Sequence, residues 1–170
     1  RMNRDSRRDP KGSIQLNIHA FQDLLEICKE EKVRKVVWAS SSVVYGTKTD
    51  RAARYGEDMA DCILTEKTPY CPGSLYSYTK EFLEGLSKYY REYHDLDTVA
   101  LRVNLVYGPF ISSSYTPFFS SLIDKPALGE EGAVPYGDSV MDWQYVGDMG
   151  DIFRAVILSS QNNTPTYQTR

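Results

Sequence analysis

The sequence has few of the residues that build metal centres, hydrolytic triads or disulfide frameworks. Its two histidines, His19 and His94, stand beside no serine or carboxylate in an arrangement typical of a triad or a zinc site. Its three cysteines are an odd number without metal-ligand spacing, which predicts packing for Cys28 and free thiols for Cys62 and Cys71. The sequence therefore predicts no metal site and no structural disulfides.

Long apolar runs and an excess of one charge are also missing. The chain contains no stretch of about 18 apolar residues and no signal peptide, so we expect a soluble, cytoplasmic protein that does not enter a membrane. The net charge is only -3 with 25% charged residues, which provides no electrostatic basis for binding nucleic acid. At 170 residues, the chain is long enough to bury one sizeable core.

A glycine-rich turn between a strand and a helix, the usual pyrophosphate cradle of a dinucleotide fold, is absent as well. The segment 129–132 has two glycines, but two acidic residues lie between them and no helix pattern follows. We therefore do not expect this segment to bind phosphate.

Helical and strand patterns alternate along the chain. Apolar residues at helical spacing predict a helix from Ser13 to about Glu31, and short apolar runs predict buried strands at 36–39 and 98–103. A further helix is predicted from about Ser74, and its core stripe is expected to be Phe82, Leu86, Tyr89 and Tyr93. Between them, the polar stretch 47–75 is expected to be a long loop that covers a site. The alternation predicts an α/β fold with a parallel sheet.

The segment Tyr76-Ser77-Tyr78-Thr79-Lys80 opens the second helix and places a phenol one turn before an ammonium. A nearby lysine favours the phenolate, and a phenolate near neutral pH is a base that can take a proton from a sugar or alcohol hydroxyl. An ordinary tyrosine pKa of ~10 would have to fall by about 3 units, so we expect a partly desolvated cleft and further positive charge. The pair alone is also compatible with an ordinary helix face.

Three serines, Ser40, Ser41 and Ser42, follow the first predicted strand and precede Tyr45-Gly46. Ligands of parallel sheets bind at the carboxyl ends of the strands, where these hydroxyls fall. One of them can hydrogen-bond a reacting oxygen as charge develops. The alternative is that the serines satisfy loop amides.

With these two blocks the chain resembles the extended short-chain dehydrogenase/reductase family of NAD-dependent epimerases and dehydratases. Further matches are Asn17, Leu101-Arg102, Val106-Tyr107-Gly108-Pro109 and the segment 142–148, in the family's order. The resemblance implies a Rossmann-like doubly wound parallel sheet with part of a smaller substrate domain. It also implies NAD or NADP as cofactor, a carbohydrate or nucleotide-sugar substrate, and a homodimer through the two helices beside the site.

The resemblance assigns roles residue by residue. Ser41, Tyr76 and Lys80 are the expected catalytic residues. Asn17 and Ser40 are expected to help Tyr76 and Lys80 hold the cofactor, although Asn17 can equally be a buried polar group bonded to backbone. Ser42 and Asn104 are expected to contact the substrate.

Departures from the family pattern reduce the number of reactions and substrates that the resemblance allows. The dehydratases of the family carry an Asp-Glu pair where this chain has Ser42 and Val43, which argues against dehydration. Leu105 and Met141 stand where nucleotide-sugar enzymes usually carry a substrate-binding asparagine and a phosphate-binding arginine. Epimerisation and simple dehydrogenation both remain open, as does another carbohydrate substrate.

The order of the motifs predicts two regions, residues 1–110 from the later part of the cofactor domain and residues 111–170 from an interleaved substrate region. Because no glycine-rich loop is present, we expect the chain to be an internal piece of a longer enzyme. The alternative is a catalytically silent structural or binding chain that retains the half-fold.

Overall fold

The computed structural model describes residues 3–109, 116–133, 142–160 and 166–169. The chain divides into two compact units, a first of residues 1–104 and 153–169 and a second of residues 105–152. The predicted assignment of residues 1–110 to cofactor binding and 111–170 to substrate binding stays a prediction. None of the described helices has the length and apolar character needed to cross a membrane.

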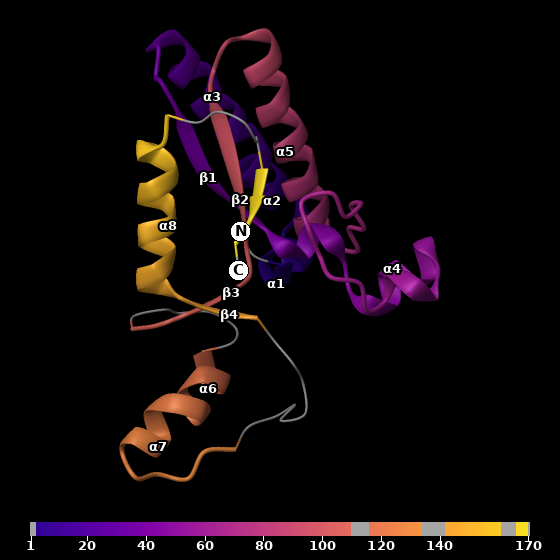
Figure 1. Cartoon of the computed structure of the whole chain (residues 1–170), viewed down its shortest axis with the longest axis vertical. Coiled ribbons are helices and arrows are strands. Elements are labelled where there is room, and N and C mark those ends of the chain that lie inside the picture. The colour runs from indigo at the N-terminus through magenta and orange to yellow at the C-terminus, as the bar shows by residue number, and fades with distance from the viewer. Residues whose placement is uncertain (1–2, 110–115, 134–141, 161–165, 170) are drawn as a thin grey trace. The chain divides into compact units, whose positions relative to one another are not determined.

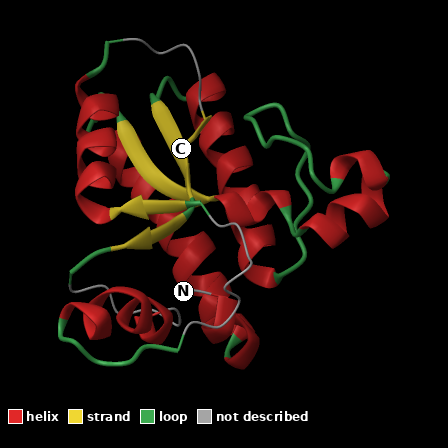
Figure 2. Ribbon diagram, turned by 60° about the horizontal axis from the view of Figure 1, so that its bottom comes forward, coloured by secondary structure: helices red, strands yellow, loops and turns green. Residues whose placement is uncertain are grey.

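The first unit is built on a parallel sheet of three described strands, β1 (Val36–Ser41), β2 (Thr98–Val103) and β5 (Thr166–Gln168), in the order β1-β2-β5. Helices α3 (Ala20–Glu30) and α5 (Leu75–Tyr93) lie on one side of these strands (Figure 1). The last part of α8 (Val146–Leu158), which belongs to this unit, lies on the other side. Figure 2 shows the strands of the sheet between helices from a second direction. The predicted α/β class with a parallel sheet is confirmed.

The helical run before β1 consists of α2 (Pro10–Ile14), the π-helical turn η1 (Gln15–His19) and α3 (Ala20–Glu30), after a short α1 (Asn3–Arg8). This matches the predicted helix, except that one turn is π-helical. Leu25 and Cys28 are buried in a core with Tyr90 and Leu96. The predicted packing role of Cys28 is therefore confirmed.

Helix α5 (Leu75–Tyr93) begins at a capping box in which Ser74 and Ser77 satisfy each other's backbone N–H groups. The predicted core stripe of this helix is wrong for three of its four residues, and only Leu86 packs against the core. Phe82, Tyr89 and Tyr93 are 53%, 50% and 63% exposed, whereas Leu83 and Tyr90 are buried. Two apolar stripes lie one residue apart on α5, and spacing alone does not tell which one the sheet covers.

The stretch 47–75 is more ordered than a loop. It contains α4 (Lys48–Tyr55), started by a capping box between Thr47 and Asp50, and the 3-10 turn η3 (Glu57–Met59). Buried Arg51 donates to the carbonyl oxygens of Gly46, Met59 and Ala60 at 3.0, 2.9 and 2.8 Å. The prediction of a long loop is therefore wrong, because side-chain bonds to backbone fold this stretch locally. The expected role of this stretch as a cover over a site stays a prediction.

The second unit contains the parallel pair β3 (Leu105–Tyr107) and β4 (Trp143–Tyr145) and the helical segments α6 (Thr116–Phe119), η4 (Ser120–Asp124) and α7 (Lys125–Ala127). Phe119 packs edge-on to Trp143, with ring centroids 4.4 Å apart. Helix α8 (Val146–Leu158) follows β4 directly and ends in the first unit.

Candidate active site

Ser41 lies at the junction where β1 ends and the 3-10 turn η2 (Ser42–Tyr45) begins. Its backbone is extended (φ -152°, ψ 145°), and its hydroxyl accepts a hydrogen bond from the Val43 N–H at 3.4 Å. The same hydroxyl lies close enough to the phenol of Tyr76 to lower the pKa of that phenol. The structure therefore brings together two of the three predicted catalytic residues, which are 35 positions apart in the sequence.

Lys80 lies one turn after Tyr76 on α5, and its ammonium reaches the end of β1. Its Nζ atom donates to the Ala39 carbonyl at 2.7 Å. It lies 5.3 Å from the ring centroid of Trp38 and 5.7 Å from that of Tyr76, within the range of cation–π attraction. All three predicted catalytic side chains therefore gather at the carboxyl end of β1.

In the chain without a bound ligand, burial has the largest effect on the pKa values of Tyr76 and Lys80. Burial raises the pKa of Tyr76, and the hydrogen bond with Ser41 opposes that rise. Burial also lowers the pKa of Lys80, while the carboxylate of Glu84 raises it. The expected lowering of the phenol's pKa is thus not a property of these residues by themselves, because desolvation of the phenolate outweighs the stabilisation they provide.

The other predicted cofactor residues lie at different places in the first unit. Asn17 is half-buried in the π-helical turn η1, which packs against α5. Single π-helical turns inside α-helices occur frequently at functional sites. Ser40 is 3% exposed and its hydroxyl donates to Glu84. A cofactor contact remains a prediction for both residues.

The two predicted substrate residues flank the strand ends. Ser42 is half-buried in the first position of η2, next to Ser41. Asn104 directly follows β2, and its side-chain amide donates to the Thr169 carbonyl at 3.4 Å. Both stay predictions as substrate ligands.

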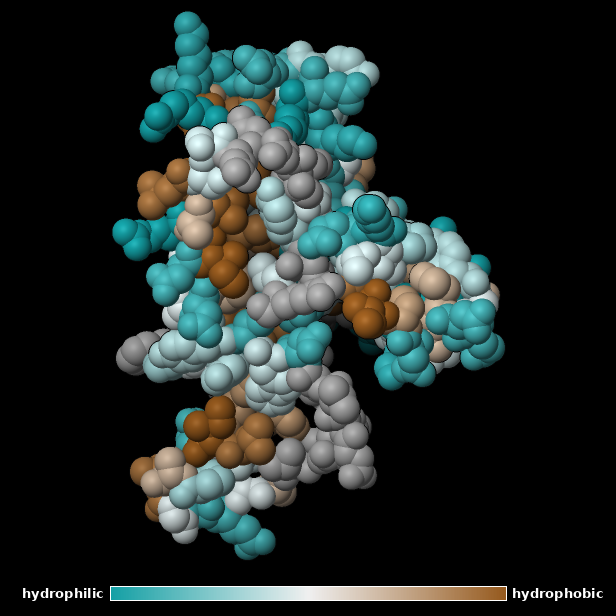
Figure 3. All heavy atoms as spheres, in the orientation of Figure 1, coloured by the Kyte–Doolittle hydropathy of each residue, from teal (hydrophilic) through white to brown (hydrophobic). Residues whose placement is uncertain are grey.

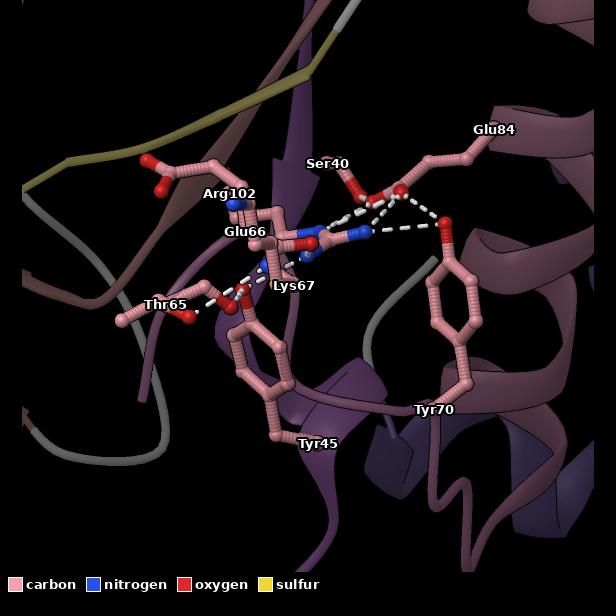
Figure 4. A network of polar contacts seen from close by, with 8 residues as sticks. All are labelled: Ser40, Tyr45, Thr65, Glu66, Lys67, Tyr70, Glu84 and Arg102. Atoms are coloured by element: carbon pink, nitrogen blue, oxygen red, sulfur yellow. Dashed lines mark hydrogen bonds and ion pairs between the residues drawn. The ribbon is translucent and has the colours of Figure 1, made fainter. Parts of the chain in front are cut away.

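A buried charge network that the sequence analysis missed includes Ser40, the residue directly before Ser41 (Figure 4). The Arg102 guanidinium on β2 donates to the Glu84 carboxylate on α5 at 2.7 Å, and these side chains are 2% and 1% exposed. The phenol of Tyr70 bridges both, with 2.8 Å to each partner, and Arg102 also donates to the Tyr45 hydroxyl at 2.6 Å. Burial and the neighbouring Glu84 carboxylate raise the pKa of Tyr70 to about 12, so this phenol stays a hydrogen-bond donor.

A sequence signal for this network exists in hindsight. Arg102 stands inside an apolar strand, and Glu84 stands among the residues of α5 that face the sheet. Charged side chains are rarely buried unless they are paired, so a charge inside a core strand predicts a buried partner of opposite sign.

Among the described residues, no group of three or more His, Cys, Asp and Glu side chains is placed to hold a metal ion. What the fold and the site define is a parallel α/β unit with a serine, a tyrosine and a lysine at the carboxyl end of one strand. This combination is the arrangement of the short-chain dehydrogenase/reductase class that the sequence resembles. The chain belongs to the NAD dependent epimerase/dehydratase family, whose sequence model matches residues 2–168.

Comparisons with individual proteins agree with this assignment. The chain is 31% identical over 144 residues to UDP-glucuronate 4-epimerase 3 of Arabidopsis thaliana, covering 83% of this chain and 31% of the relative. It is 27% identical over 148 residues to the protein CapI of Staphylococcus aureus, covering 86% of this chain and 40% of that protein. The chain thus spans about a third of the length of these curated relatives.

Two solved structures of similar fold are named as nucleotide-sugar epimerases. A UDP-N-acetylglucosamine 4-epimerase from Methanobrevibacter ruminantium M1, in complex with UDP-N-acetylmuramic acid, has a TM-score of 0.77 and 30% identity, covering 99% of this chain and 51% of that one. A UDP-glucuronic acid 4-epimerase from Bacillus cereus, in complex with UDP-glucuronic acid and NAD, has a TM-score of 0.72 and 26% identity, covering 93% and 46%. The chain therefore spans about half of each of these proteins.

Proposed function

We propose that this chain carries the catalytic residues of an NAD-dependent nucleotide-sugar 4-epimerase. The observation that supports the proposal most directly is the proximity of the Ser41 hydroxyl to the Tyr76 phenol, with the Lys80 ammonium beside them at the end of β1. The named activities of the similar proteins support the substrate class. Simple dehydrogenation of a sugar uses the same residues and is the alternative outcome of the tests.

In the proposed mechanism, Tyr76 is the base and Ser41 positions the reacting oxygen. The deprotonated phenol takes the proton from the sugar hydroxyl as the carbon that bears it becomes a carbonyl. The Ser41 hydroxyl hydrogen-bonds that oxygen while its charge changes. When the carbonyl is reduced again on its other face, Tyr76 returns the proton and the hydroxyl has the opposite configuration.

The donors at the end of β1 fit the nicotinamide riboside end of NAD or NADP. An ammonium has three N–H donors, and the Ala39 carbonyl accepts one of those of Lys80. Lys80 and Tyr76 would hold ribose hydroxyls, and Asn17 and Ser40 are the further proposed cofactor residues. Bound there, the cofactor would supply hydride transfer from and back to the carbinol carbon, and its oxidised ring would supply positive charge that favours the Tyr76 phenolate.

The function is tested by following UDP-sugar C4 epimers with the full-length protein, using proton NMR to observe both epimers. We expect UDP-glucuronic acid or UDP-N-acetylglucosamine to equilibrate with its C4 epimer without net consumption of NAD. Stoichiometric formation of NADH would instead identify a dehydrogenase. A protein that neither turns over UDP-sugars nor binds NAD or NADP by calorimetry would contradict the proposal and favour the catalytically silent alternative.

We further propose that the chain forms a homodimer through α3 and α5. The outer faces of these helices expose large apolar side chains, which single solvated helices seldom do. They are Leu24 and Ile27 on α3 and Phe82, Tyr89 and Tyr93 on α5, between 45% and 63% exposed. A second apolar area lies over α8 (Figure 3), where Ile157 and Leu158 are 55% and 71% exposed.

The two apolar areas offer a matched comparison. Replacing Phe82 and Tyr89 by glutamate should convert the dimer to a monomer in sedimentation velocity, because carboxylates would be buried in the interface. Leu158→Glu, on the competing area, should leave the dimer intact. A protein that is monomeric before substitution, or a dimer that only Leu158→Glu dissociates, would contradict the proposed interface.

A further inference from the structure

We propose that Glu84 and Arg102 are positioning residues that hold the Ser41 hydroxyl in place beside Tyr76. The inference rests on the proposed function, and it extends the catalytic group to a buried ion pair that touches none of the reacting atoms. Its basis is the way in which the pair is bonded to the chain on both sides of Ser41 and to the helix that carries Tyr76.

The first attachment is on the residue before Ser41. Ser40 lies directly opposite Arg102 in the register of β1 and β2, so the two side chains emerge on the same face of the sheet. Both meet the Glu84 carboxylate, which accepts hydrogen bonds from the Ser40 hydroxyl and from Arg102 Nε at 3.1 Å. The β1 residue directly before Ser41 is thereby bonded to α5.

The second attachment is on the turn after Ser41. Ser41 caps η2, and η2 ends at Tyr45, whose hydroxyl accepts from Arg102 Nη1 at 2.6 Å and donates to the Thr65 carbonyl at 2.8 Å. The Tyr45 side chain is fully buried. Ser41 therefore lies between two residues that the same ion pair holds.

The third attachment is on the helix of the base. Glu84 follows Tyr76 on α5 by eight residues, about two helical turns. One rigid helix thus carries both the base and the carboxylate that anchors β1. Because reacting groups displaced by about 1 Å lose on the order of 100-fold in rate, an anchor of this kind contributes directly to turnover.

Stability and positioning can be separated because buried ion pairs respond asymmetrically to substitution. Removing one partner leaves an unpaired buried charge and is strongly destabilising, whereas replacing both by apolar residues of similar size is often neutral. Arg102→Met alone should lower the Tm by about 10 °C. The double variant Glu84→Leu/Arg102→Met should regain a Tm within about 5 °C of the original, yet its apolar side chains cannot bond Ser40 or Tyr45.

The decisive measurement is kcat of the full-length protein and its response to Ser41→Ala. We expect kcat of the double variant to stay about 100-fold low. Ser41→Ala should lower kcat by about 100-fold in the original protein but by less than about fivefold in the double variant. A displaced Ser41 hydroxyl contributes little to catalysis, so its removal then has little effect. A stable double variant with original kcat and an undiminished Ser41→Ala effect would overturn the inference.

Two further comparisons keep the result interpretable. Asp97→Asn removes a carboxylate that pairs with Arg91 at 3.1 Å just before β2 begins, so it should lower the Tm without weakening the effect of Ser41→Ala. If the double variant does not fold, Tyr45→Phe tests the inference in its place, because it removes the bond between Arg102 and the turn after Ser41. Tyr55→Phe is its control. Tyr45→Phe should lower kcat about tenfold, and an unchanged kcat and Ser41→Ala effect would overturn the inference. If instead Tyr76→Phe is fully active, the proposed function fails and not this inference alone.

Discussion

Replacing Tyr76 by phenylalanine should lower kcat of the full-length protein by at least about 100-fold, because the proposed base loses the group that carries the proton. The substitution removes one hydroxyl and its interaction with the nearby Ser41 hydroxyl. The free energy of unfolding should therefore change by no more than about 1–2 kcal/mol, measured by urea denaturation. Loss of turnover in a protein of nearly original stability is the expected result.

Tyr78 provides the matched control. It lies on the same helix two residues later, is 54% exposed, and is out of phase with Lys80. Tyr78→Phe should leave kcat and stability unchanged. If Tyr76→Phe keeps kcat within about threefold, less than ~0.7 kcal/mol of activation free energy, then Tyr76 is not the base.

Replacing Lys80 by methionine should shift the pH dependence of turnover as well as its size. Burial already raises the pKa of Tyr76, and the nearby ammonium favours the phenolate. With the ammonium gone the phenol's pKa rises further, so a smaller fraction is deprotonated at any given pH. The acidic limb of the kcat profile should move to higher pH by about one unit or more, and activity near neutrality should fall about tenfold or more.

Affinity for NAD tests the second proposed role of Lys80. Removing hydrogen bonds from a charged donor to the ribose should weaken binding by about tenfold or more, measured by calorimetry. Lys88→Met removes an exposed lysine further along α5 and should change neither the pH limb nor the affinity. An unshifted limb together with unchanged NAD affinity in Lys80→Met would show that Lys80 is only a charge on a helix face.

Local patterns in the sequence determined the elements and the residues at their ends. The spacing of Tyr76 and Lys80 places them on one helix face, because that relation depends only on the helical repeat. The apolar runs at 36–39 and 98–103 predict parallel strands, and polar residues that follow such strands fall at the edge where ligands bind. These inferences need no knowledge of which residues distant in the chain meet.

Only the tertiary structure decided which surfaces are buried and how the charges are balanced. Spacing favoured Phe82 and Tyr89 for the core of α5, but the sheet covers the adjacent stripe, where Glu84 meets Arg102. The sequence predicts a loop at 47–75, yet Arg51 and a capping box fold this stretch through bonds to its own backbone. The direction of the pKa change at Tyr76 also depends on burial, which is a property of packing and not of the order of residues.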